Sequence, residues 1–141
     1  MSSMENARNP TDIRELLIED IHGKLTSAAE DARKGRPRPA ILNKDAADVL
    51  WTWGAGHGFL TEEDRVKLYG ERFKVGGKGE YREGIFPERA EAECRKIIDY
   101  DDVEAEVVKR VSNVLNRVLT KINSKEDRMA VKQIIDEIPR V

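Results

Sequence analysis

The amino-acid sequence predicts an all-α protein, a single-domain bundle of five or six helices around a long amphipathic helix in its C-terminal half. Between Val103 and Ile122, apolar residues recur at steps of three and four for more than five turns, which indicates a helix with one buried face. The same spacing recurs near the N-terminus, from Ile13 to Ala32. A chain of 141 residues is also of single-domain length.

The first helix is predicted to begin at Asn9 and Pro10, since asparagine caps free amides and proline fits a first turn. We expect residues 1–8 to be a flexible tail and residues 9–141 to be one helical domain. The inward face should consist of Ile13, Leu16, Leu17, Ile21, Leu25, Ala28 and Ala32. The helix should end at a segment containing Gly35, Pro37 and Pro39.

Two shorter helices are predicted next. The first runs from Asn43 to Trp53, with Ala46, Val49, Leu50 and Trp53 facing inward. The glycine-rich loop after it contains Gly54, Gly56 and Gly58. Thr61 and Asp64 then resemble a capping box, and they open a helix that carries Val66, Tyr69 and Phe73.

The remaining chain is predicted to be mostly helical. Residues 73–82 should form a small hairpin or a loop, because three glycines within four residues suit either. Pro87 restarts a helix whose inner residues are Ala90, Cys94, Ile97 and Ile98. The sequence leaves open whether residues 99–102 end this helix or lie within one long helix that continues past Val103. Ser124 and Asp127 open a last helix, with apolar residues Met129, Val131, Ile134, Ile135 and Ile138.

Composition narrows the function classes. The formal charge of −2 argues against a protein that coats nucleic acid or anionic membrane along its whole length. No apolar run approaches the roughly 18 residues that a membrane span needs, and the N-terminus lacks the layout of a secretion signal. With Cys94 as the one cysteine, no internal disulfide can form. We therefore expect a cytoplasmic protein without a membrane partner.

The predicted partner-binding residues lie around the tryptophan pair. Trp51 and Trp53 are two positions apart, so they cannot both face inward. Trp53 continues the apolar stripe and should be buried, which leaves Trp51 partly exposed near His57 and Phe59. An exposed tryptophan beside a flexible apolar loop suits a binding hot spot. Packing of Trp51 against the first helix is an equally good alternative.

Nucleic-acid binding is the first alternative function. Two short helices followed by a hairpin imitate a winged helix-turn-helix, and Lys74, Lys78 and Arg82 would then face phosphates. The basic run from Arg33 to Arg38 could add an arm. Two features oppose this interpretation: the second helix begins with three acidic residues, and a seven-residue connection replaces a tight turn.

A metal-dependent helical nucleotide hydrolase is the second alternative. Glu88 and Glu91 share a helix face, as do Asp102 and Glu106, but a doubled-glutamate motif with a second acidic pair is lacking. Three weaker signals have ordinary explanations: Glu19 with His22 at di-iron spacing, Cys94 at an inner position, and the loop from Gly76 to Gly79, which lacks the phosphate-loop ending. We therefore predict no catalytic residue, no metal and no cofactor.

Because each of these alternatives lacks a feature that it needs, the sequence favours a non-enzymatic protein-protein interaction or assembly module, such as an accessory subunit or a small regulator. It would present helical and loop surfaces to a protein partner. The valine seam could also join two copies in a homodimer, although burial within one chain is the default. The seam consists of Val108, Val111, Leu115, Val118 and Ile122.

Overall fold

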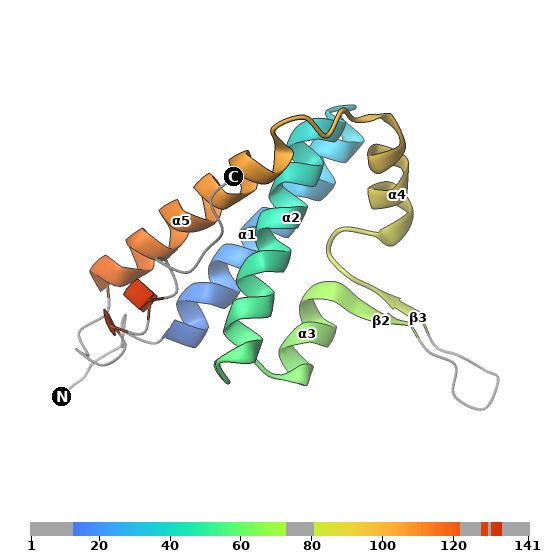
Figure 1. Cartoon of the computed structure of the whole chain (residues 1–141). Helices are drawn as coiled ribbons and strands as arrows, with labels where there is room; N and C mark the ends of the chain where they lie inside the picture. The colour runs from blue at the N-terminus through green and yellow to red at the C-terminus, as the bar shows by residue number, and fades with distance from the viewer. Residues whose placement is uncertain (1–12, 73–80, 122–127, 130, 134–141) are drawn as a thin grey trace.

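The computed structural model describes residues 13–72, 81–121, 128–129 and 131–133. Within these ranges the chain forms a bundle of helices α1 to α5, further helical residues at 128–129 and 131–133, and one small two-stranded sheet (Figure 1). The predicted all-α bundle is confirmed. No helix of the described residues is both long and apolar enough to cross a membrane.

The largest helix contact joins α1 (Ile13–Arg33) and α2 (Pro37–Gly56), which run side by side (Figure 1). Helix α1 ends as predicted, with Gly35 in the left-handed conformation at a φ of 74°. Because α2 also contacts α4 and α5, the centre of the bundle is α2 and not the valine-rich helix. The buried face of α1 agrees with the prediction except that Leu16 and Ala32 are only half-buried and Ala29 was not predicted. It consists of Ile13, Leu17, Ile21, Leu25, Ala28 and Ala29.

Helix α2 begins six residues earlier than predicted, at Pro37 instead of Asn43, because proline is tolerated in a first turn. The inward placement of Val49 is wrong: its side chain is 40% exposed, since it lies about 200° around the helix from buried Ala47. Alanine and glycine make up more than half of the buried face. Its residues are Ala40, Ile41, Leu42, Ala46, Ala47, Leu50 and Gly54. A Cβ on Gly54 would lie 2.6 Å from Leu60 Cδ1, so this glycine permits the close packing.

Helix α3 (Glu62–Tyr69) begins with the predicted capping box between Thr61 and Asp64, which the structure confirms. Strand β2 (Gly70–Arg72) follows it and pairs antiparallel with β3 (Tyr81–Glu83). The strands thus flank residues 73–80, which lie outside the described residues.

The chain returns from β3 across the end of α3. The Ile85 amide donates to the Leu68 carbonyl at 3.1 Å. A Cβ on Gly84 would lie only 2.4 Å from the carbonyl carbon of Tyr69. Glycine is therefore required at position 84 for the two backbones to approach this closely.

Helices α4 (Glu88–Ile97) and α5 (Val103–Lys121) are separate, which settles the question left open by the sequence. Asp102 ends the break with a φ of 63°. Cys94 is buried as predicted, but the inward placement of Ile97 is wrong, because its side chain is 71% exposed. Ile97 lies in the last turn of α4, to one side of the face that Cys94 and half-buried Ala90 turn to the core.

The valine-rich helix α5 packs against α2 and, less extensively, against α1. Its buried residues are Val103, Val107, Val111, Val114, Leu115 and Val118. Val108 is only half-buried, which shifts the seam slightly from the predicted one, and Ile122 lies outside the described residues. Val111, Leu115 and Val118 are covered within one chain, as the default expectation has it. A homodimer through this seam stays an untested prediction.

Of the predicted last helix, residues 128–129 and 131–133 are helical. Val131 is fully buried, whereas Met129 is 61% exposed. The start of that helix at Ser124, its apolar residues from Ile134 onward, the tail 1–8 and the predicted start at Asn9 and Pro10 lie outside the described residues.

Candidate functional site

The structure separates the aromatic residues that the sequence grouped together. Trp51 packs edge-on against Tyr69 of α3, with ring centroids 5.9 Å apart and planes at 68°. Trp53 instead packs against His57 and Phe59, with ring centroids 5.3 Å and 5.8 Å apart, respectively. The expectation that Trp51 lies near His57 and Phe59 is therefore wrong. Two positions on a helix differ by about 200°, so the loop after α2 can reach only one of the tryptophans.

Trp53, His57 and Phe59 form what we call the aromatic cluster, at the C-terminal end of α2. The His57 amide donates to the Trp53 carbonyl at 3.1 Å, and the Phe59 amide donates to the Gly54 carbonyl at 2.9 Å. Between them, Gly58 has a φ of 82°, a conformation that glycine adopts readily. These hydrogen bonds fold the loop back so that both rings lie against Trp53.

The aromatic cluster combines apolar surface with one buried hydrogen-bond donor that has no acceptor in the described part of the chain. Trp53 and Phe59 are half-buried and His57 is exposed. The indole Nε1 of Trp53 is buried, and no acceptor in the described part of the chain meets it. A buried N–H without a partner costs about 1–3 kcal/mol.

The other flank of α2, around Trp51, also carries a buried polar group, since the Tyr69 hydroxyl meets no hydrogen-bond partner in the described part of the chain. The Lys44 ammonium lies 5.7 Å from the centre of the Tyr69 ring, close enough for a cation–π contact. Burial raises the pKa of the Tyr69 hydroxyl, and the negative charge of nearby Asp48 raises it further. Burial also raises the pKa of Asp48, although Lys44 opposes the shift.

Charged residues of α2 and α4 form one connected set, the α2–α4 ionic network of Lys44, Asp45, Asp48, Glu91 and Arg95. Lys44 Nζ lies 2.7 Å from Asp48 Oδ2 and 3.2 Å from Glu91 Oε1. Arg95 Nη2 lies 2.6 Å from Asp45 Oδ1 and 2.9 Å from Glu91 Oε2. Although burial opposes it, hydrogen bonding to Asp45 and its neighbours raises the pKa of Arg95. Every member is thus paired with a residue of opposite charge.

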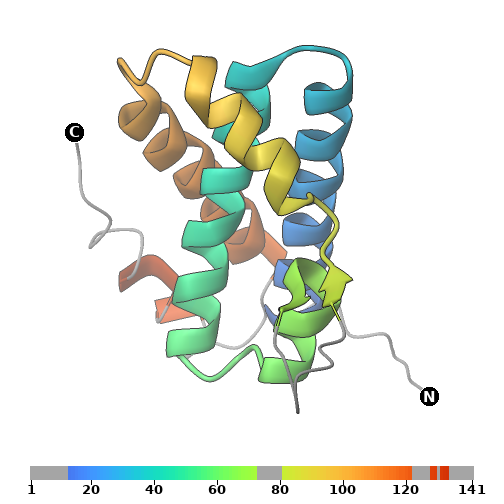
Figure 2. The same cartoon turned by 90° about the vertical axis from the view of Figure 1, so that its right-hand side faces the viewer.

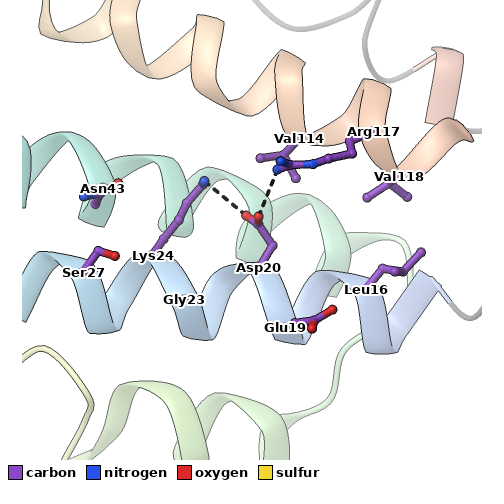
Figure 3. A pocket seen from close by; sticks show the side chains of 10 residues that line it. All are labelled: Leu16, Glu19, Asp20, Gly23, Lys24, Ser27, Asn43, Val114, Arg117 and Val118. Atoms are coloured by element: carbon purple, nitrogen blue, oxygen red, sulfur yellow. Dashed lines mark hydrogen bonds and ion pairs between the residues drawn. The ribbon is translucent and has the colours of Figure 1, made fainter. Parts of the chain in front are cut away.

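A groove of about 440 Å³ lies between α1 and α5 (Figure 3). At its centre, Asp20 Oδ2 lies 3.3 Å from Lys24 Nζ, and Asp20 Oδ1 lies 3.4 Å from Arg117 Nη2. With Glu19 at the wall, two acidic residues balance two basic ones, so the groove offers no excess charge to a ligand. The lining residues are Leu16, Glu19, Asp20, Gly23, Lys24, Ser27, Asn43, Val114, Arg117 and Val118.

Two of the carboxylates considered for a metal site form ion pairs with basic side chains. Glu91 belongs to the α2–α4 ionic network, and Glu106 pairs with Arg110 at 3.3 Å. His22 is exposed on α1. Among the described residues, no three His, Cys, Asp or Glu side chains are grouped so that they could hold a metal ion. Burial raises the pKa of Cys94, which disfavours its reactive thiolate form.

The residues of the nucleic-acid alternative are only partly placed. Arg82 lies in β3, where its Cα pairs with that of Glu71, while Lys74 and Lys78 lie outside the described residues. The order α2, α3, β2, β3 does match a winged helix. However, α3 packs against α1 more than against α2, unlike the second and third helices of that motif.

The basic run near Gly35 is paired with acidic side chains. Arg33 and Lys34 both contact Glu30, and Arg36 Nη1 lies 3.9 Å from Asp31 Oδ1. Arg38 Nη1 donates to the Asp99 carbonyl at 3.1 Å. These contacts reduce the positive charge that the run could offer to phosphates.

Sequence reasoning missed Trp53 as the centre of the aromatic cluster, although a usable signal existed: Trp53 and His57 are four residues apart and so share a helix face. No comparable signal pointed to the groove, since Asp20 and Arg117 are 97 residues apart. Comparison with known proteins adds nothing to either site: no family model, no curated protein and no solved structure matches this chain.

Proposed function

We propose that this chain is a non-enzymatic protein-binding module, an accessory subunit or small regulator, and that the aromatic cluster contacts its partner. The observation that carries the proposal is the exposed His57 ring against half-buried Trp53, whose buried indole N–H meets no acceptor among the residues that the structure describes. We place the protein in the cytoplasm, in keeping with its single cysteine.

Aromatic side chains carry much of the binding energy in protein interfaces because they bury large areas with few rotatable bonds. Phe59 and Trp53 supply such area, and the His57 ring adds a polar edge. A partner carbonyl could also accept from Trp53 Nε1 once neighbouring side chains move aside. That hydrogen bond would offset the cost of leaving the donor unpaired.

The test is affinity capture from the native host, comparing wild type with His57→Ala and Phe59→Ala. The matched control is His22→Ala, which removes the chain's other histidine, also exposed but on α1. We expect the two cluster variants to lose a captured protein by about tenfold or more, as hot-spot truncations do, while His22→Ala retains it. Equal capture by all four proteins, each with an unchanged melting temperature, would contradict the proposal.

Nucleic-acid binding remains the alternative from another class, and the antiparallel strand pair after α3 is the observation that favours it. Salt-sensitive affinity for random duplex DNA that falls when Lys74, Lys78 and Arg82 are neutralised would support this alternative. The three acidic residues of the first turn of α3, Glu62, Glu63 and Asp64, count against it.

A further inference from the structure

Helix α4 is attached to the bundle by a smaller apolar contact than its neighbours. Its one buried residue is Cys94, whereas α1 buries six residues and α2 seven. The other side chains of α4 in contact with the core are small, with Ala90 half-buried and Ile97 turned to solvent. Apolar burial contributes in proportion to area, so the hydrophobic stabilisation of α4 is slight.

Two ion pairs also join α4 to α2. Glu91 and Arg95 of α4 reach Lys44 and Asp45 of α2 through the α2–α4 ionic network. The Arg95 and Asp45 side chains are partly open to solvent, 31% and 28% exposed, whereas those of Lys44 and Glu91 are 12% and 19% exposed. The more open pair of Arg95 with Asp45 is therefore the weaker one and the one that salt screens more.

Extended residues bound α4 at both ends, next to buried Phe86 on one side and at half-buried Ile98 on the other. Pro87 precedes the helix and Ile98 follows it, both in extended conformations. Figure 2 shows α4 lying across the outside of the bundle, over α1 and α2. No strand or helix among the described residues covers its outer face, where Glu93 and Lys96 are about 70% exposed.

We propose that α4 is a displaceable strap, which detaches from α1 and α2 while the rest of the bundle stays folded. Detachment uncovers the Cys94 thiol and breaks the pairs of Lys44 with Glu91 and of Asp45 with Arg95. Local opening of this kind is expected where few apolar contacts would be lost. The inference rests on the packing of α4 and is independent of the aromatic cluster.

The single cysteine makes this measurable, since alkylation of the native protein by iodoacetamide reports the opening of α4 at Cys94. We expect the alkylation rate, normalised to that of the unfolded chain, to rise about five- to tenfold in Arg95→Ala and to rise with added NaCl. Arg117→Ala is the matched control, because it removes an ion pair of α5 that does not involve α4. Its alkylation rate should equal that of wild type.

The dependence of the rate on urea separates local from global opening. If α4 opens alone, the logarithm of the rate rises with a much smaller slope than the equilibrium unfolding of the whole chain. Hydrogen exchange of α4 amides should then be faster than that of α1 and α2. A rate that follows global unfolding, or that is unaffected by both NaCl and Arg95→Ala, would overturn the proposal.

Discussion

The two flanks of α2 each carry a tryptophan, and the two tryptophans pack against different parts of the chain. Trp51 packs against Tyr69, which α3 and the return of the chain at Gly84 hold in place. Trp53 packs against His57 and Phe59, which belong to the loop that leaves α2. Both tryptophans are half-buried, so the difference shows that the segment brought alongside, more than the position on α2, decides which rings each tryptophan contacts.

The largest expected effect comes from adding a side chain at Gly84, which lies against the backbone of Tyr69. Gly84→Ala would place a Cβ 2.4 Å from the Tyr69 backbone, and backbone cannot move aside as a flexible side chain can. We expect the free energy of unfolding to fall by about 3 kcal/mol, measured by urea denaturation. Trp51 fluorescence should shift as well, because Tyr69 would be displaced.

Gly23→Ala is the matched control, since a Cβ at this position in α1 meets no atom within 4 Å. Alanine is the better helix former, so this variant should gain about 0.5–1 kcal/mol. If Gly84→Ala were as stable as wild type, the account of the chain's return across α3 would be wrong.

A smaller effect is expected at Asp64, which anchors the start of α3 and so supports both flanks. Burial alone would raise the pKa of Asp64, but the Thr61 amide, the Arg14 guanidinium and the Thr61 hydroxyl lower it below its ordinary value. The carboxylate accepts from Arg14 Nη2 at 2.6 Å and from the Thr61 amide at 2.9 Å. Asp64→Asn should therefore cost about 2 kcal/mol at pH 7.

The pH dependence of this cost has a defined sign. Because the pKa of Asp64 is lowered in the folded state, its contribution is present above the unfolded value of about 4 and is lost as pH falls through the folded value. The difference in unfolding free energy between wild type and Asp64→Asn should thus shrink on acidification. Glu62→Gln, an exposed change in the same helical turn, should alter stability little at either pH. A difference that grows with acidity would contradict this.

The parts of the fold that the sequence predicted well depend on local pattern. The inward face of α1 and the capping box at Thr61 and Asp64 involve residues within a few positions of each other. The face of α2 was predicted only in part: Ala46 and Leu50 are buried as expected, but a valine was favoured over other alanines. In the structure the close approach of α1 makes Ala40 and Ala47 inner residues and leaves Val49 exposed.

The candidate site was predictable only in part, for a similar reason. His57 and Phe59 were identified correctly as neighbours of a tryptophan, but the choice between Trp51 and Trp53 depended on how the loop folds back. The pairs of Arg14 with Asp64 and of Arg95 with Asp45 each join residues 50 positions apart. Such contacts follow from tertiary packing, and no local spacing announces them.

The most direct test of the central claim uses the two tryptophans as separate reporters, since the chain contains only these two. Trp51→Phe leaves Trp53 as the sole indole, and Trp53→Phe leaves Trp51. Each protein is mixed with the purified partner obtained by capture, and acrylamide quenching of its tryptophan is measured. We predict that the partner protects the indole of Trp53 and leaves the quenching of Trp51 unchanged. Protection of Trp51 alone, or of neither indole, would contradict the account.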